Sequence, residues 1–131
     1  MSTDLRIVLP NRPGTLVSAC EAIAGAGVGI EGVCGDLRPG ETWGYLHVLV
    51  EDADKARRAL EEAGFEVASE HDVDLVEVEP RVGALVEAFH KYVDEGQNIE
   101  VAYLAMNTRV VIGTEAMQRP RLGVKVKDAK Y

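Results

Sequence analysis

Residues 5–16 read LRIVLPNRPGTL, and this stretch decides the fold. Its apolar first half predicts a short strand ending at Pro10, and the residues from Asn11 to Gly14 are typical of a turn. From Thr15 onward, apolar residues recur every three or four positions, which predicts a helix with one apolar face; they are Leu16, Cys20, Ile23 and Ala24. A strand therefore passes through a tight turn directly into a helix.

The following residues complete a six-element unit. Gly25 to Gly27 end the first helix, because glycine accepts the left-handed cap conformation. Strands are predicted over 28–36 and 42–50. Asp52 is expected to cap a second helix, whose apolar face consists of Ala53, Ala56, Leu60 and Ala63. A fourth strand is predicted over 65–69. The order β-α-β-β-α-β is that of the ferredoxin-like fold.

The pattern then restarts. Strands are predicted over 74–78, 98–106 and 109–112, with a helix between the first two whose apolar stripe is Leu85, Ala88, Phe89, Tyr92 and Val93. A constant shift of 69 positions superposes the two halves. It places Arg12 on Arg81, Gly14 on Gly83, Gly27 on Gly96, Ile30 on Ile99, Glu31 on Glu100 and Gly44 on Gly113. Matches at one unbroken offset indicate two copies of one unit.

The sequence therefore predicts an α+β protein of two ferredoxin-like units, residues 1–70 and 71–131, with antiparallel sheets and helices on one face. The second copy is shorter, because only 18 residues follow Gly113. Residues 114–119 have room for one or two helical turns, so the second helix is expected to be short or absent, and 122–126 would form the last strand. Pairing the two sheets edge to edge would hide open strand edges.

Composition excludes several functional classes. The net charge of −8 argues against nucleic-acid binding, which requires neutralisation of phosphates. No apolar run approaches the length of a membrane span, and the start lacks an apolar secretory stretch. The two cysteines, Cys20 and Cys34, are too few for a disulfide framework, so a cytoplasmic setting is expected. The sequence has no metal-ligand pattern and no glycine-rich phosphate loop, so neither metal nor cofactor is predicted.

The turn after the first strand has the chemistry of a binding site. The first N–H groups of a helix have no partner within the helix and attract a carboxylate. The Asn11 side chain both donates and accepts hydrogen bonds, which suits an α-ammonium and an α-carboxylate together. Pro13 fixes the turn, and Gly14 permits close approach to the backbone. The same residues also fit a well-made turn without a ligand, and spacing alone does not separate the two interpretations.

The run from Pro10 to Leu16, the helix, and the segment Gly27-Val28-Gly29-Ile30-Glu31 resemble the signature of ACT domains, which are small regulatory modules that bind amino acids. Residues 44–50, 52–56 and 60–67 resemble the rest of that module. The resemblance implies a free-standing, non-catalytic tandem ACT protein that binds an amino acid between two modules. It also implies that the protein forms a homodimer and modulates its own assembly or an enzyme of amino-acid metabolism.

Carried over by position, the resemblance implies two walls for the ligand site. The turn would contribute Asn11, Arg12, Pro13, Gly14, Thr15 and Leu16, and the second strand of a neighbouring module would contribute Val28, Gly29 and Ile30. The second copy departs from the pattern, because Glu79 and Pro80 stand where Pro10 and Asn11 stand in the first. One functional turn per chain is therefore expected, with Asn98 and Ile99 as a possible far wall.

Two other interpretations remain open. The chain could be a regulatory subunit or scaffold that binds no ligand and acts through its sheet face. Trp43 and Tyr45 are expected on the face opposite the helices, where packing of the other copy or another chain is favoured over ligand stacking. The chain could also be an enzyme, since acylphosphatases share the element order and use an arginine in the same loop. Arg12 invites that comparison, but the surrounding loop pattern differs.

Overall fold

The computed structural model describes residues 2–119, and its first half follows the predicted order of elements. The helices and strands are β1 (Thr3–Pro10), α1 (Thr15–Gly25), β2 (Ile30–Asp36), β3 (Trp43–Val50), α2 (Ala53–Glu62) and β4 (Glu66–Asp72). The Asp52 side chain accepts a hydrogen bond of 3.1 Å from the Lys55 N–H and so caps α2 as predicted. Ala53, Ala56 and Leu60 form the buried face of that helix.

The second half repeats the start of this order and then departs from it. Its elements are β5 (Asp74–Glu77), α3 (Ala84–Asp94), β6 (Ile99–Ala105), β7 (Arg109–Thr114), the short 3-10 helix η1 (Glu115–Met117) and β8 (Gln118–Arg119). The second helix is thus reduced to a single turn, within the range that the sequence predicted. The predicted last strand, 122–126, lies outside the described residues.

All eight strands belong to one sheet, with the order β5-β7-β6-β2-β3-β1-β4-β8, so the two predicted sheets are joined edge to edge. The halves join where β2 pairs with β6 in antiparallel fashion at Gly32 and Ala105. A Cβ atom at Gly32 would lie 3.1 Å from the Ala105 Cβ, so the close approach of the strands favours glycine there. The edge strand of each half is in this way hidden by the other.

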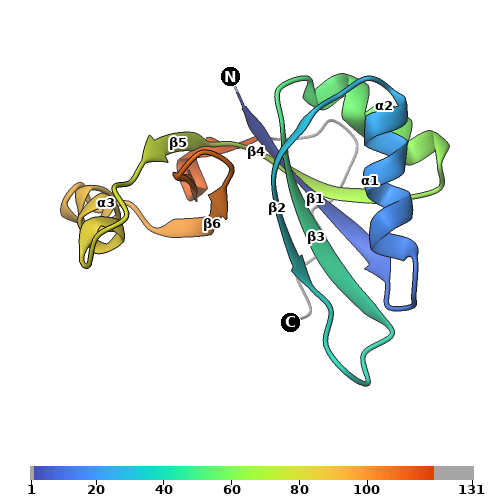
Figure 1. Ribbon diagram of the computed structural model, residues 1–131, viewed down its shortest axis with the longest axis horizontal. Helices are drawn as coiled ribbons and strands as arrows, with labels where there is room; N and C mark the ends of the chain where they lie inside the picture. The colour runs from blue at the N-terminus through green and yellow to red at the C-terminus, as the bar shows by residue number, and fades with distance from the viewer. Residues whose placement is uncertain (1, 120–131) are drawn as a thin grey trace.

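The helices lie on one side of this continuous sheet. Leu46, Val48 and Val50 of β3 belong to the core that α1 and α2 cover, whereas Val110 and Ile112 of β7 pack in a cluster with Tyr92 of α3. Figure 1 shows α1 and α2 against the first half and α3 at the far end of the second. The pairing register places the helix-facing residues of both halves on the same face of the sheet.

The sheet curls towards the face that the helices leave open. β4 runs into β5 through Val73 alone, although the two strands stand near opposite ends of the strand order. The curl packs Leu49 of the first half against Val73 and Val111. The second half therefore packs on this face at Leu49 but does not cover Trp43, which is 60% exposed.

Two predicted helical faces need correction. In α1 the buried residues are Thr15, Ala19 and Ile23, and Cys20 is only partly buried. In α3 only Ala84 and Tyr92 are buried, whereas Leu85 and Val93 of the predicted stripe are exposed. The reason is that α1 packs beside α2, while α3 has no neighbouring α-helix among the described residues.

Candidate functional site

The predicted turn between β1 and α1 borders a cleft of about 590 Å³. Arg12, Pro13, Gly14 and Thr15 line one side of it. Trp43 and the segment from Ala63 to Glu66, between α2 and β4, line the remainder. The cleft therefore combines a cationic side chain, the beginning of a helix and an exposed aromatic ring.

Local geometry leaves the start of α1 open to an anion. Gly14 is the N-cap residue in the left-handed conformation (φ 90°), and it has no side chain to cap the helix. The Thr15 hydroxyl lies 2.7 Å from the Pro10 carbonyl oxygen and stabilises the turn. Within residues 2–119, no group accepts a hydrogen bond from the N–H of Leu16 or Val17. These two N–H groups therefore point out of the helix as unpaired donors.

Asn11 has a different role from the one that the sequence suggested. Its side-chain amide donates hydrogen bonds to the carbonyl oxygens of Arg38 (2.9 Å) and Glu41 (2.8 Å). Its backbone N–H donates to the Thr42 carbonyl at 2.9 Å. Asn11 thus fastens the loop between β2 and β3 to the turn, and it is not among the residues that line the cleft.

The remaining predicted site residues lie elsewhere. Val28 and Gly29 line a separate cavity of about 400 Å³. Pro10 pairs with Trp43 at one end of β3 and Ile30 with Val50 at the other. At about 3.3 Å per residue the two predicted walls of the site are roughly 23 Å apart within one half. Leu16 packs towards β2, Asn98 precedes β6, and Ile99 pairs with Thr114 on β7.

The turn before α3 reproduces the first turn closely. Gly83 has φ 88° and ψ −12°, against 90° and −13° for Gly14. The bond from the Arg81 N–H to the Glu79 carbonyl (2.8 Å) matches the one from the Arg12 N–H to the Pro10 carbonyl (3.0 Å). The side chains differ, since Arg81 pairs with Glu79 and Glu87, whereas Arg12 has no ion pair with any residue of the described chain.

A buried polar cluster on the inner face was missed by the sequence analysis. Asp4 is fully buried, and its carboxylate accepts a hydrogen bond of 2.6 Å from the Tyr103 hydroxyl. His47 Nδ1 lies 2.9 Å from the other oxygen of Asp4. Burial, and then the Asp4 charge, raise the pKa of Tyr103 above its ordinary value, so the phenol remains a donor. The alternation of Asp4 and Arg6 with apolar neighbours in β1 was the available signal.

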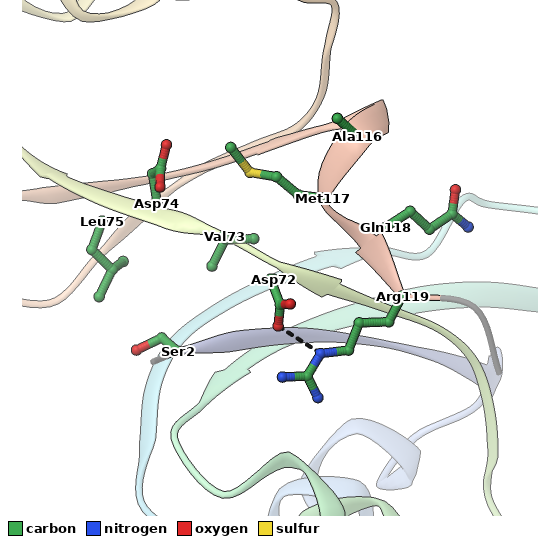
Figure 2. A pocket seen from close by; sticks show the side chains of 9 residues that line it. All are labelled: Ser2, Asp72, Val73, Asp74, Leu75, Ala116, Met117, Gln118 and Arg119. Atoms are coloured by element: carbon green, nitrogen blue, oxygen red, sulfur yellow. Dashed lines mark ion pairs between the residues drawn. The ribbon is translucent and has the colours of Figure 1, made fainter.

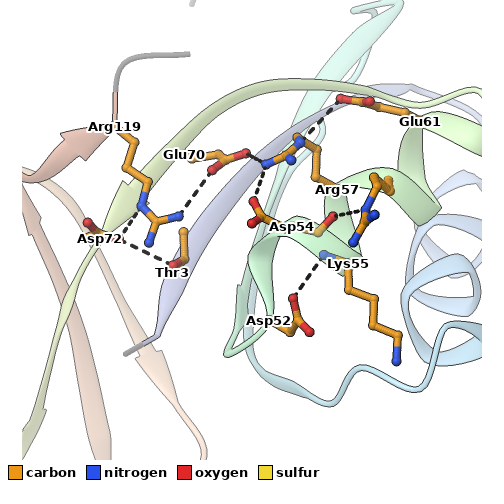
Figure 3. A network of polar contacts seen from close by, with 10 residues as sticks. Thr3, Asp52, Asp54, Lys55, Arg57, Glu61, Glu70, Asp72 and Arg119 are labelled. Atoms are coloured by element: carbon orange, nitrogen blue, oxygen red, sulfur yellow. Dashed lines mark hydrogen bonds and ion pairs between the residues drawn. The ribbon is translucent and has the colours of Figure 1, made fainter. Parts of the chain in front are cut away.

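A third cavity, of about 630 Å³, lies where β4 runs into β5 (Figure 2). Arg119 borders it and pairs through Nε with Asp72 at 2.6 Å. Figure 3 shows Arg119 and Arg57 of α2 on two sides of Glu70, at 3.6 Å and 2.7 Å. Because these charges are compensated within the chain, the arginines secure β8 and α2 to β4. Within residues 2–119 no group of three metal-ligating side chains comes together, and no helix has the length and apolarity to cross a membrane.

Comparison with known proteins gives structural relatives. No family model matches the chain, and no curated protein matches its sequence. Protein BT0572 from Bacteroides thetaiotaomicron is 30% identical, with a TM-score of 0.72 over 86% of this chain and 78% of that one. The ligand-free regulatory subunit of aspartate kinase from Thermus thermophilus is 18% identical, with a TM-score of 0.65 over 86% and 82% of the two chains. The corresponding subunit from Thermus flavus is 19% identical, with a TM-score of 0.62 over 88% and 83%.

These similarities, together with the strand order and the turn geometry, show that the chain has an ACT-type fold. The similarity to the aspartate kinase subunits concerns the fold. The chain belongs to the same family as BT0572.

Proposed function

We propose that this chain is a cytoplasmic, non-catalytic regulatory protein that binds an amino acid at the turn between β1 and α1. Binding would change its self-association or the activity of an enzyme of amino-acid metabolism. The observation that carries the proposal is the cleft at the first turn of α1, where Arg12, a cation without an ion-pair partner in the described chain, lies on the same lining as the exposed Trp43. A carboxylate suits the arginine, and the tryptophan ring suits an apolar side chain.

A tandem arrangement of two units supports this proposal. Besides the two turns, the helix ends correspond: Gly27 and Gly96 donate 2.9 Å hydrogen bonds to Ala24 and Val93, and both have positive φ. The sheet register also shifts at equivalent places, between Ile30 and Gly32 and between Ile99 and Val101. We infer two ACT-like units, 1–70 and 71–131, of which the second has lost most of its second helix.

The separation of the predicted walls supports a site shared between two modules, and we propose that the second module comes from a homodimer partner or from the second half of the chain. A ligand at Asn11 to Leu16 cannot also contact Val28, Gly29 and Ile30 of the same half. Another module must supply that wall, either a second chain or the second half through Asn98 and Ile99. Binding would then favour one assembly state over another, since a ligand shifts only an equilibrium between states that it binds unequally. The partner enzyme is inferred by analogy with the regulatory subunits of aspartate kinase.

A ligand screen tests the proposal. Each standard amino acid is added at millimolar concentration and the unfolding temperature is measured. A ligand present at 100 times its Kd stabilises the folded state by about 2.7 kcal/mol, which raises that temperature measurably. Sedimentation velocity with and without the active amino acid then reports the change in assembly. No shift with any amino acid would refute amino-acid binding and favour a scaffold that binds no ligand.

Matched variants locate the site. Arg12→Ala is expected to abolish the shift, whereas Arg81→Ala, which removes the equivalent arginine of the second turn, should leave it intact. Asn11→Ala should also abolish it, by freeing the loop between β2 and β3. Retention of the full shift in Arg12→Ala would move the site away from this turn.

A further inference from the structure

The second turn shows how an arginine at this position receives a carboxylate. The Arg81 guanidinium forms two hydrogen bonds to Glu87, from Nη2 at 2.6 Å and from Nη1 at 3.1 Å, and a third to Glu79 from Nε at 3.0 Å. Glu87 lies on the first turn of α3. This two-point geometry is the strongest arrangement between a guanidinium and a carboxylate.

The first turn offers the same arginine without the carboxylates. The shift that places Arg81 on Arg12 places Glu87 on Ser18 and Glu79 on Pro10. The backbones of the two turns also match at the position of Glu87 and Ser18. The Glu87 N–H donates to the Gly83 carbonyl at 3.0 Å, and the Ser18 N–H donates to the Gly14 carbonyl at 2.9 Å. The position that Glu87 holds in the second turn is therefore held by a short, uncharged serine in the first, beside the cleft that Arg12 and Ser18 line.

We propose that Arg12 binds the carboxylate of a small ligand in the two-point geometry in which Arg81 binds Glu87. In the second turn the Glu87 carboxylate already occupies that position and so prevents a ligand from binding there. The inference rests on the proposed function and adds to it the group that receives the carboxylate and the reason why one turn per chain binds. The ligand class is a small carboxylate that can enter the cleft. Arg12→Lys keeps the positive charge but loses the paired N–H donors of the planar guanidinium, so this variant should bind the ligand more weakly.

The decisive variant is Ser18→Glu, which gives the first turn the carboxylate of the second. The introduced carboxylate should pair with Arg12 and compete with the ligand. With a mixture of the standard amino acids as the probe, the concentration needed to reach a given thermal shift should rise about tenfold or more, as expected for the loss of a charged hydrogen-bonded contact. Ala24→Glu adds the same charge to an exposed position farther along α1, and it should leave that concentration nearly unchanged.

A second measurement tests, without any ligand, whether the introduced carboxylate pairs with Arg12. Arg81 lowers the pKa of the Glu87 carboxyl in the second turn. The carboxyl that Ser18→Glu introduces should likewise have a lowered pKa in an NMR titration, and an ordinary one when Arg12→Ala is added. An ordinary pKa in the single variant would overturn the equivalence of the turns and with it the inference.

The outcomes separate the two proposals. A lowered pKa together with undiminished binding in Ser18→Glu would overturn the role of Arg12 while leaving amino-acid binding in place. A wild-type chain that shows no thermal shift with the mixture would overturn the proposed function itself. A lowered pKa together with weakened binding, and normal binding in Ala24→Glu, would support both.

Discussion

Gly44 on β3 is the position where a single methyl group would disturb the fold most. A Cβ atom there would collide with the Leu37 side chain and lie 2.5 Å from the Asp36 carbonyl oxygen, which belongs to the backbone and cannot turn away. At the equivalent Gly113, the nearest atoms are side-chain carbons of Val73 and Val101, at 3.2 and 3.4 Å. We expect Gly44→Ala to lower the free energy of unfolding by about 3 kcal/mol or more and Gly113→Ala by about 1 kcal/mol. Urea denaturation of both variants measures the difference, and equal losses would contradict this explanation.

At the same scale, Gly27 and Asn11 show what sequence can and cannot predict. Gly27 ends α1 with φ 78°, and the need for a residue that tolerates this conformation is local, so the sequence predicts it. The partners of Asn11 are the carbonyls of Arg38 and Glu41, 27 and 30 residues away. They depend on how the loop between β2 and β3 folds back, which no local pattern specifies. The glycine at position 27 was therefore predictable from the sequence, whereas the hydrogen-bond partners of Asn11 were not.

Among the elements, α3 contacts the sheet through a small cluster in which its Tyr92 and Phe89 pack with Val110 and Ile112. Tyr92 is 7% exposed, and its hydroxyl donates a hydrogen bond of 2.7 Å to Asp74 on β5. Burial, followed by the Asp74 interaction, raises the pKa of Tyr92. We expect Tyr92→Phe to cost about 1 kcal/mol and to speed amide hydrogen exchange in α3 but not in α1. Val17→Ala, at an exposed site on α1, should change stability by less than about 0.5 kcal/mol. Equal acceleration in both helices would mean that α3 does not open separately.

The exposed stripe of α3 illustrates a limit of periodicity. The spacing of Leu85, Phe89 and Val93 correctly predicts a helix, because the repeat of apolar residues matches its turn. Burial depends on a neighbour. α1 packs beside α2, whereas among the described residues the single turn η1 adds only Met117 to the cluster around Tyr92 of α3. Periodicity therefore predicts the helix but not which of its apolar residues a neighbouring element covers.

For the molecule as a whole, edge-to-edge pairing of the halves was an expectation from the sequence, but which two strands meet could not have been derived from it. Within residues 2–119 the pairing of β2 with β6 is a single bridge at Gly32, supported by the 3.1 Å hydrogen bond from the Met106 N–H to the Glu31 carbonyl. Arg109 adds a 3.5 Å ion pair to Glu31. Repeats and periodicity describe each unit separately, whereas the union of two sheets depends on which edges meet. The curl that brings Tyr103 to Asp4 follows from that union.

Tyr103 links the two halves through Asp4, and removing its hydroxyl should weaken the whole molecule. In Tyr103→Phe the fully buried Asp4 carboxylate loses its 2.6 Å donor and retains His47 at 2.9 Å. We expect a loss of about 2 kcal/mol in the free energy of unfolding at neutral pH, because a buried charge is left short of a hydrogen bond. Guanidinium unfolding measures it, and a loss below about 0.5 kcal/mol would show that the contact does not hold the halves together.

The pH dependence of the same variant follows from the raised pKa of Tyr103. The unfolded chain releases the phenolic proton near pH 10, whereas the folded chain keeps it. The stability that Tyr103 contributes is therefore complete below about pH 10 and is lost as the pH rises towards the folded value. Wild-type stability should fall above pH 10 more steeply than that of Tyr103→Phe, by up to about 1.4 kcal/mol per pH unit. Parallel declines in urea titrations across this range would mean that the Tyr103 hydroxyl is not buried against Asp4. The contact between the halves would then rest on the cluster of Leu49, Val73 and Val111 and on the junction of β2 with β6.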